Sequence, residues 1–536
     1  DFEDGVLTMK HGITTLSLFL SLAAFPVVAQ SPQEQCLALS TPGAAIEHRM
    51  VAMPDAPTRI LKSTIDAAVD GLPESCRVSG LIAPHTHFEL RMPTKNWNGK
   101  FLMLGCGGYC GSIDSRRSDP GLARNYAVVL TDMGHQGSSW LFAYNNLQGE
   151  IDFAYRSTHT VAVASKEIID AYYGSRADKN YFMGCSTGGR QAMVEAQRFP
   201  RDFDGIVAGA PVYDETGDGA YFVLWSALAN IGQNGKPILS PEKLPLIRNA
   251  VMEQCDGADG LKDGVLQDPR QCTWQPSDMQ CGLGQSTDKC LTADEVGVVN
   301  KIYSGATNSD GDPWYFGMSL GSEYTWTPEF IGQDGKIGDW LEGPQSFGEE
   351  FITTMPFFYD LPIGTPAATF DFDTDPPRMG LTEVLYNAQN PDLRKFKKNG
   401  GKLLLYHGWD DDQIPPGISV DYYETSTRTM GGPDQTTDFF RMFMIPSMLH
   451  CIMGGPGGTE VDWITAIENW VEKDEAPEQI VVHRMKTTGY SVPRARHPLD
   501  PDEYDQKRPV YPYPAVARFK GVGDPNDPDA WQKTEE

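Results

Sequence analysis

The stretch NYFMGCSTGGRQ, residues 180–191, decides which fold this sequence adopts. Its first four residues predict a buried strand, residues 184–188 form a tight turn, and a helix is expected from about 189 to 198. The turn has the pattern Gly-x-Ser-x-Gly, which exposes the hydroxyl of Ser186 at the N-terminus of a helix. There the helix dipole and the amide of Thr187 can stabilise an oxyanion, so the pattern favours a nucleophilic serine over a polar turn.

The alternation of strand and helix continues on both sides of this stretch. Helices are predicted at residues 157–173, near 418–430 and near 463–473. Further buried strands are predicted at the apolar runs 100–104, 127–132, 205–211, 402–407 and 439–445. Such alternation predicts an α/β fold with a mainly parallel sheet covered by helices on both faces.

The alternation is interrupted between about residues 212 and 395. This segment contains four of the ten cysteines and many aromatic residues, and we predict that it is a large inserted lid domain. The sheet domain is then expected in two parts, residues 30–211 and residues 396–536.

Residues 1–29 are predicted to be a leader and signal peptide. Met9-Lys10-His11 precedes an apolar run at residues 13–24, and Ala29 suits the cleavage site. The run is shorter than the ~20 residues of a membrane helix, so no membrane association is expected. Ten cysteines suit an oxidising compartment, and we expect a secreted or periplasmic protein.

The charge balance excludes one broad class of function. The 536 residues include 44 Lys plus Arg against 72 Asp plus Glu, a formal net charge of −28. A protein that binds nucleic acid through a general basic surface would have the opposite balance. An apolar content of 40% is sufficient for a packed core and argues against disorder.

Residues 185–191, CSTGGRQ, and the distant pair His450-Cys451 resemble the tannase/feruloyl esterase family of α/β-hydrolases. That family also includes the mono-(2-hydroxyethyl) terephthalate hydrolases, and the resemblance runs from about residue 36 to the C-terminus. It implies an α/β-hydrolase fold with a lid. It also implies a serine esterase that hydrolyses aromatic acyl esters, of the feruloyl or galloyl type, through a Ser-His-Asp triad and an acyl-enzyme.

His450 is the preferred general base because it follows the last long predicted strand, in the chain order Ser-Asp-His of α/β-hydrolases. His135 is a distant second candidate, and His407 is interpreted as a packed core residue. The family's His-Gly-Trp-x-Asp form points to Asp411 as the acid, whose role is to orient the imidazole. Asp410 and Asp412 are interpreted as a solvated acidic turn.

The second oxyanion donor is expected from the glycine loop after residue 104, where Gly108 or Gly107 would act with Thr187. The family implies a Cys185–Cys451 disulfide, which would make Ser186 and His450 near neighbours because a disulfide holds its Cα atoms within about 7 Å. The other expected pairs are Cys36–Cys76, Cys255–Cys272, Cys281–Cys290 and a local Cys106–Cys110 bridge, which the family does not generally have.

Residues 255–265 form an Asp- and Gly-rich loop in the predicted lid. Clustered Asp and Gly often form plain turns, but oxygen donors at this density also suit Ca²⁺. The resemblance implies a structural calcium site at this loop. Its ligands would be the side chains of Asp256, Asp259 and Asp263 and the carbonyl groups of Leu261 and Val265.

The expected partner is a small aromatic ester, with no nucleic acid and no membrane, and the chain is expected to be a monomer or homodimer. One alternative is a terephthalate-monoester hydrolase. That branch binds the substrate carboxylate with a lid arginine, whereas no arginine occurs between Lys301 and Arg378 here. The other alternative is a non-catalytic binding protein on the same fold.

Overall fold

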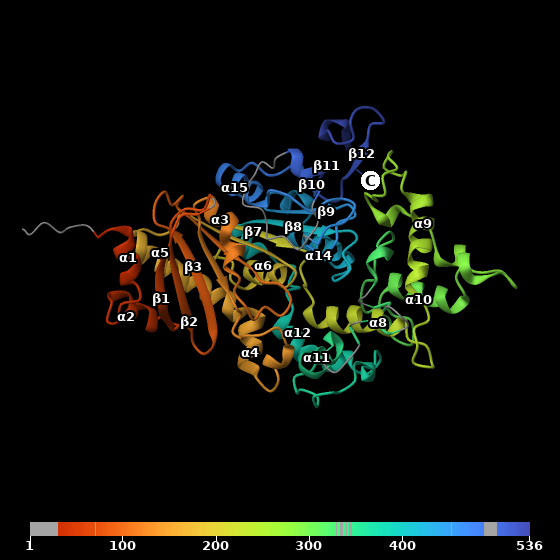
Figure 1. Ribbon diagram of the computed structural model, residues 1–536, viewed down its shortest axis with the longest axis horizontal. Helices are drawn as coiled ribbons and strands as arrows, with labels where there is room; N and C mark the ends of the chain where they lie inside the picture. The colour runs from red at the N-terminus through yellow and green to blue at the C-terminus, as the bar shows by residue number, and fades with distance from the viewer. Residues whose placement is uncertain are drawn as a thin grey trace, which may run out of the picture.

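A computed structural model describes residues 30–535, apart from residue 70 and residues 328–329, 333–335, 339, 342–345, 452 and 487–500. The predicted signal peptide therefore lies outside the described residues. The central element is a nine-stranded sheet in the order β1-β2-β3-β5-β4-β6-β7-β8-β9 (Figure 1). None of the described helices combines the length and the apolar composition that a membrane crossing needs.

The second part of the sheet, from β5 to β9, is parallel throughout, as the sequence predicts. Five of its six strands are buried along nearly their whole length, and β6 is buried in part, which explains why most of them are continuous apolar runs in the sequence. These strands are β4 (Lys100–Leu104), β5 (Ala127–Thr131), β6 (Lys179–Cys185), β7 (Gly205–Gly209), β8 (Lys402–Gly408) and β9 (Phe440–Ile445).

The first part of the sheet is antiparallel and was not predicted from the sequence. It comprises β1 (Thr58–Asp66), β2 (Ser75–Ile82) and β3 (Thr86–Pro93), and β3 pairs antiparallel with β5. In β2, buried residues alternate with half-buried ones, so no continuous apolar run marks the strand. The N-terminal helices α1 (Pro32–Ala38) and α2 (Ala45–Val51) pack against β1.

Helices cover both faces of the sheet. Alternate side chains of β4 show this, since Phe101 and Met103 belong to the core under α5 (Ser157–Tyr173) and α6 (Thr187–Arg198). Leu102 and Leu104 belong to a second core, under α15 (Trp463–Lys473). The remaining helices of the sheet domain are α3 (Asp119–Ala123), α4 (Leu147–Ile151), α13 (Arg394–Lys398) and α14 (Gly417–Met430).

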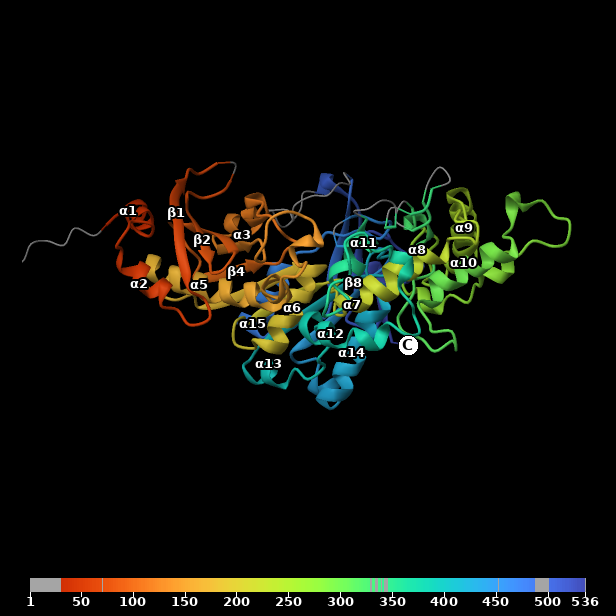
Figure 2. The same ribbon diagram turned by 90° about the horizontal axis from the view of Figure 1, so that it is seen from below.

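The segment between β7 and β8 contributes no described strand to this sheet. Its helices α9 and α10 lie at the end of the molecule opposite to β1 and β2 (Figures 1 and 2). Besides α13 at its end, the described helices of the segment are α7 (Glu215–Gly217), α8 (Trp225–Ala229), α9 (Leu244–Cys255), α10 (Ala293–Ser304), α11 (Phe347–Thr354) and α12 (Gly380–Tyr386).

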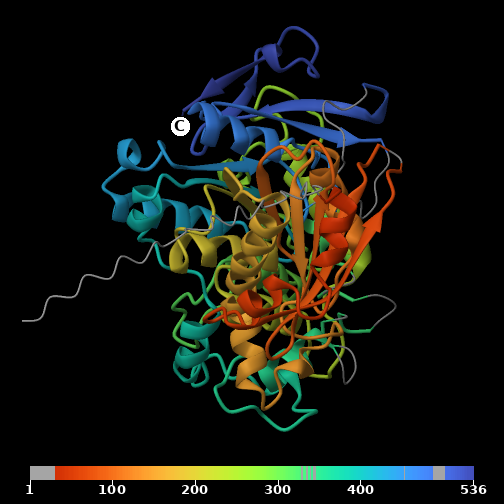
Figure 3. The same cartoon turned by 90° about the vertical axis from the view of Figure 1, so that its left-hand side faces the viewer.

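The C-terminal part of the chain adds two small antiparallel sheets, which the sequence did not predict. They are formed by β10 (Ile480–Met485) with β11 (Tyr504–Val510), and by β12 (Val516–Phe519) with β13 (Trp531–Thr534). Seen from the β1 end, this C-terminal segment, in blue, lies on the opposite side of the sheet from residues 350–390, in teal (Figure 3).

Candidate active site

Ser186 lies at the turn between β6 and α6, with the backbone angles φ 66° and ψ −129°. A positive φ is uncommon for a residue with a side chain and indicates a constrained turn. The two flanking glycines make the turn possible: a Cβ atom at Gly184 would lie 2.4 Å from the carbonyl oxygen of Gly188, and one at Gly188 would lie 2.7 Å from that of Cys106. The local geometry is therefore that of a nucleophile elbow.

His450 and Asp411 form a buried hydrogen-bonded pair. His450 lies beyond the end of β9, and its Nδ1 is 2.8 Å from Oδ2 of Asp411, which lies beyond the end of β8. The second carboxylate oxygen, Oδ1, accepts hydrogen bonds from the backbone amides of Gln413 at 3.0 Å and Ile414 at 2.9 Å. These bonds direct Nε2 of His450 away from Asp411 and leave it available for another partner.

The pair has the electrostatics of a base held by a carboxylate. Burial alone would lower the pKa of His450, but the Asp411 carboxylate outweighs this and raises the pKa above its ordinary value. Burial would raise the pKa of Asp411, but His450 and His407 together hold it well below its ordinary value. Asp411 is therefore a permanent anion at neutral pH and favours the imidazolium form of His450.

A disulfide joins the turn that contains Ser186 to the loop that contains His450. Cys185 and Cys451 are bonded, and their Cα atoms are 5.9 Å apart although 266 positions separate them in the chain. Ser186 and His450 line the same cavity, of about 450 Å³. Nε2 of His450 makes no hydrogen bond, so the bond to the serine is not formed in this structure; such bonds often tighten only when substrate binds.

The other two histidine candidates have different surroundings. His407 is buried and bonded, with Nδ1 2.7 Å from Oγ of Ser419 and Nε2 3.2 Å from Oδ2 of Asp411. The interpretation of His407 as a packed core residue is confirmed, and the structure adds that it helps to hold the acid. His135 stacks on Phe142 at 3.6 Å and does not line the cavity that contains Ser186.

The interpretation of Asp410 and Asp412 as a solvated turn is wrong. Asp410 is 0% exposed and Asp412 7% exposed. The inserted segment covers this loop, because the hydroxyl group of Tyr324 donates a hydrogen bond to Oδ2 of Asp410 at 3.1 Å. Burial raises the pKa of Asp410 to about 7, whereas the pKa of its neighbour Asp411 is lowered.

The glycine loop after β4 lies directly beside the start of α6. Gly107 and Gly108 line the cavity together with Ser186, as an oxyanion donor must. The hydroxyl group of Thr187 donates a hydrogen bond to the carbonyl oxygen of Gly108 at 2.7 Å. Two of the three residues predicted for the oxyanion hole, Gly107 and Gly108, thus line the cavity, and Thr187 is bonded to Gly108 without lining it.

The rest of the cavity lining was not predicted. It combines apolar side chains with a charged rim, in which Arg116 pairs with Asp114 at 2.8 Å and Arg124 with Asp462 at 2.8 Å. Arg117 also lines it and donates a hydrogen bond to the carbonyl oxygen of Gly105 at 2.7 Å. The adjacent arginines 116 and 117 are visible in the sequence, but only the order of the strands brings them to the serine.

The aromatic residues of the insertion do not reach this cavity: no described residue of the insertion lines it. Trp326, Phe330 and Phe351 are buried in the apolar core. Trp314 and Phe316 instead line a more open cavity next to Trp409, on the side of α14.

The predicted calcium loop contains buried carboxylate oxygens without a partner. Asp256 accepts hydrogen bonds from the amide of Gly264, and Asp263 accepts one from Arg508 at 3.0 Å. Oδ2 of Asp259 and Oδ1 of Asp263 are buried and make no hydrogen bond. Such orphaned oxygens fit a bound cation.

The geometry of this loop fits a cation only in part. Three possible metal ligands from different His, Cys, Asp or Glu side chains come within 4.8 Å of one another at one place among the described residues. That place is His159, Glu195 and Asp202, outside this loop. The three loop carboxylates therefore do not all come within 4.8 Å of one another in this structure. Leu261 and Val265, whose carbonyl groups were the other two predicted ligands, lie in different surroundings. Leu261 packs against the C-terminal core, and Val265 is buried beside a cavity of about 390 Å³.

All ten cysteines are paired, and the five pairs are those expected. Besides Cys185–Cys451, the bonds are Cys36–Cys76, Cys106–Cys110, Cys255–Cys272 and Cys281–Cys290. The 255–272 bond closes the loop that carries the buried carboxylates.

The sequence matches the family model described as tannase and feruloyl esterase over residues 70–533. The chain is 34% identical to the mono(2-hydroxyethyl) terephthalate hydrolase of Piscinibacter sakaiensis, covering 86% of this chain and 85% of that protein. It is 32% identical to a probable feruloyl esterase B-2 of Aspergillus terreus, covering 85% of each chain.

The crystal structure of feruloyl esterase B from Aspergillus oryzae superimposes with a TM-score of 0.78 and 26% identity, covering 94% of this chain and 100% of that one. The tannin acyl hydrolase of Aspergillus niger shares the fold, with a TM-score of 0.73, 18% identity, and coverage of 94% and 95%. The chain therefore belongs to the tannase and feruloyl esterase family of α/β-hydrolases and is a carboxylic ester hydrolase.

Proposed function

We propose that the protein is an exported serine esterase that hydrolyses aromatic acyl esters, of the feruloyl, hydroxycinnamoyl or galloyl type. The observation that carries this proposal is the His450–Asp411 pair, together with the Cys185–Cys451 disulfide, which joins the loop of His450 to the turn of Ser186. The names of the feruloyl esterase relatives support the class of acyl group.

In the proposed reaction, Ser186 attacks the ester carbonyl while Nε2 of His450 takes its proton. The amides of Thr187 and of Gly108 or Gly107 stabilise the oxyanion, and the alcohol leaves with the proton from His450. His450 then activates water to hydrolyse the acyl-enzyme. Asp411 holds the imidazole orientation throughout and stabilises its charged form.

A terephthalate monoester is the second candidate substrate, favoured by the 34% identity to a hydrolase of that name. Three observations weigh against it. The insertion has no arginine between Lys301 and Arg378, and the net charge of −28 repels an anionic substrate at long range. The arginines at the cavity rim are already engaged by Asp114, Asp462 and a backbone carbonyl. A non-catalytic binding protein is not retained, because the family consists of esterases.

Export to an oxidising compartment is part of the proposal. It is supported by the apolar run at residues 13–24 after a basic start, and by the pairing of every cysteine in a disulfide.

A structural Ca²⁺ ion at residues 256–265 is also proposed. The support is the pair of buried, unpartnered oxygens on Asp259 and Asp263, together with the hardness of the carboxylate donors. Arg508 touches Asp263 from the C-terminal segment, so an ion here would join the insertion to that segment. The ion would act on stability and not on the ester.

A panel of aryl esters tests the substrate class. The value of kcat/KM for methyl ferulate or methyl gallate is expected to exceed that for the terephthalate monoester by about tenfold or more, since a carboxylate without a charged partner forgoes ~1.5–3 kcal/mol. Ser186→Ala is the control and should lose turnover on every ester. Comparable values for the neutral esters and the monoester would contradict the preference, and an active Ser186→Ala would contradict the mechanism.

Replacement of Asp411 by Asn tests the acid. Turnover should fall by up to ~10⁴-fold, as expected when the imidazole loses its orienting anion. The acidic limb of the residual kcat/KM profile should also move to lower pH, because Asp411 is what raises the pKa of His450.

Asp410→Asn is the matched control for this substitution, since Asp410 is equally buried but bonds to Tyr324 and to neither histidine. Its turnover should stay within a few-fold of the wild type. If Asp410→Asn or Asp412→Asn abolishes turnover while Asp411→Asn does not, the assignment of the acid is wrong.

Removal of calcium is expected to lower thermal stability. Chelation should decrease the Tm, and added Ca²⁺ but not Mg²⁺ should restore it, because a ligand bound only by the folded state stabilises that state. Asp259→Asn should abolish the response, whereas Asp278→Asn, an exposed acid in the same insertion, should keep it. A Tm that is identical with chelator and with Ca²⁺ would refute the site.

A further inference from the structure

The Cys106–Cys110 disulfide encloses the glycines of the oxyanion loop. The two cysteines are only four positions apart, and Gly107, Gly108 and Tyr109 are the residues between them. The bridge thus closes a small ring whose backbone amides include both glycine candidates for the oxyanion hole. This inference rests on the function proposed above.

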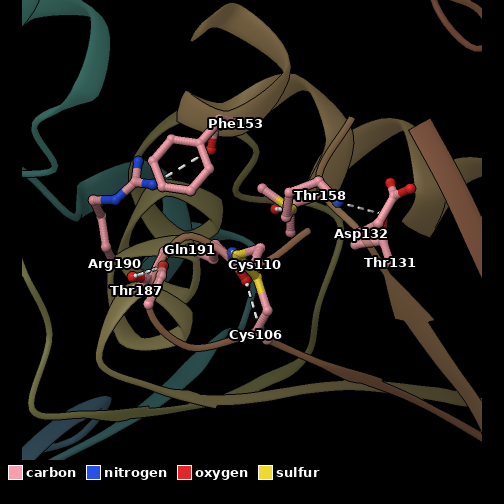
Figure 4. The surroundings of a disulfide bond; sticks show 12 residues. Cys106, Cys110, Thr131, Asp132, Phe153, Thr158, Thr187, Arg190 and Gln191 are labelled. Atoms are coloured by element: carbon pink, nitrogen blue, oxygen red, sulfur yellow. Dashed lines mark hydrogen bonds between the residues drawn. A yellow bond between two sulfur atoms is a disulfide. The ribbon is translucent and has the colours of Figure 1, made fainter. Parts of the chain in front are cut away.

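The ring is fastened to α6, the helix that begins at the nucleophile elbow (Figure 4). Nε2 of Gln191 lies 2.9 Å from Sγ of Cys106, and Oε1 of Gln191 accepts a hydrogen bond from the Cys106 amide at 3.3 Å. Thr187 binds the carbonyl group of Gly108 from the first turn of the same helix. The bridge and the nucleophile are therefore positioned by one rigid element.

The backbone inside the ring has conformations that need support. Gly108 has a φ of 55° and Cys110 a φ of 63°, which is uncommon for a residue with a side chain. A Gly-Gly sequence has wide conformational freedom when it is not constrained. The amide of Cys110 donates to the carbonyl oxygen of Gly107 at 3.1 Å, and the amide of Gly111 donates to that of Asp132 at 3.1 Å, so the loop is also anchored beyond the bridge.

An oxyanion hole needs rigid donors. Its amides must lie 2.7–3.1 Å from the position that the oxyanion reaches, and a displacement of about 1 Å can cost ~10²-fold in rate. A Gly-Gly pair alone is too free to meet this requirement, whereas a closed ring fixed to α6 restricts the motion of its amides.

We propose that the Cys106–Cys110 disulfide positions the oxyanion amides of Gly107 and Gly108 against Ser186. Cys106 and Cys110 are positioning residues, because they act through the glycine backbone and do not touch the substrate. The bridge consequently stabilises the transition state, in which the oxyanion forms, more than it stabilises the bound substrate.

The test compares the Cys106→Ser/Cys110→Ser variant with the wild type. The kcat for a ferulate ester should fall by about 10-fold to 100-fold, while KM changes less than about twofold. The inhibition constant of an arylboronic acid, which forms a tetrahedral adduct with Ser186, should rise by the same factor as kcat falls. Inhibition by the free aromatic acid, a ground-state ligand, should not change.

Cys281→Ser/Cys290→Ser is the matched control, because it removes a short-range bridge in the insertion, far along the chain from the cavity residues. It should leave kcat and the boronic acid constant unchanged. If the double variant does not fold, Cys110→Ser alone opens the ring and retains the Cys106 contact with Gln191, and it should give the same pattern.

An unchanged kcat in a folded variant without the bridge would overturn the inference, as would equal effects on the boronic acid and on the free acid. These outcomes are distinct from a failure of the proposed function, which an active Ser186→Ala would reveal.

Discussion

The disulfide between Cys185 and Cys451 is the constraint on which the rest of the active centre depends. Each cysteine is the chain neighbour of one member of the proposed triad, and their Cα atoms are 5.9 Å apart. Both turns have a non-glycine residue at positive φ, Ser186 at 66° and Cys451 at 56°. In the chain-entropy model, closing so long a loop also stabilises the folded state by about 5–6 kcal/mol. The bond therefore links folding of the sheet domain to the distance between nucleophile and base.

The strand ends, the hydrogen bonds of Asp411 and the contacts of the insertion and of α6 complete the site around the two turns that this disulfide joins. The ends of β6, β8 and β9 deliver Ser186, Asp411 and His450 to one edge of the sheet, where α/β folds place their ligands. Asp411 is held by two backbone amides. His450 and His407 outweigh the effect of burial and hold its pKa below the ordinary value. The insertion contacts the same loop through Tyr324, and α6 holds the glycine loop after β4 through Thr187 and Gln191. Asp411 and His450 are thus bonded to each other before substrate arrives, whereas the bond from His450 to Ser186 is not.

The parallel half of the sheet could be predicted because strands buried on both faces are continuous apolar runs. The antiparallel strand β2 was missed since its buried residues alternate with half-buried ones. Ser186 was identified from its local pattern, whereas the assignment of Asp411 needed the family resemblance. The burial of Asp410 was unpredictable from its neighbours, because its cover, Tyr324, lies 86 positions away. The arginines at the cavity rim were missed for a similar reason: only the strand order places them near the serine.

The most direct test of the central claim is the rate at which a fluorophosphonate labels Ser186 in Cys185→Ser/Cys451→Ser. Labelling requires a serine activated by a base within about 2.6–3.2 Å. Thermal unfolding of the variant first shows that it is folded. The account predicts that this variant is labelled at least about tenfold more slowly than the wild type. Its labelling rate should also depend less on pH, because the serine has lost its base. Labelling at the wild-type rate would show that the nucleophile and the base are held together without the disulfide, and would contradict the account.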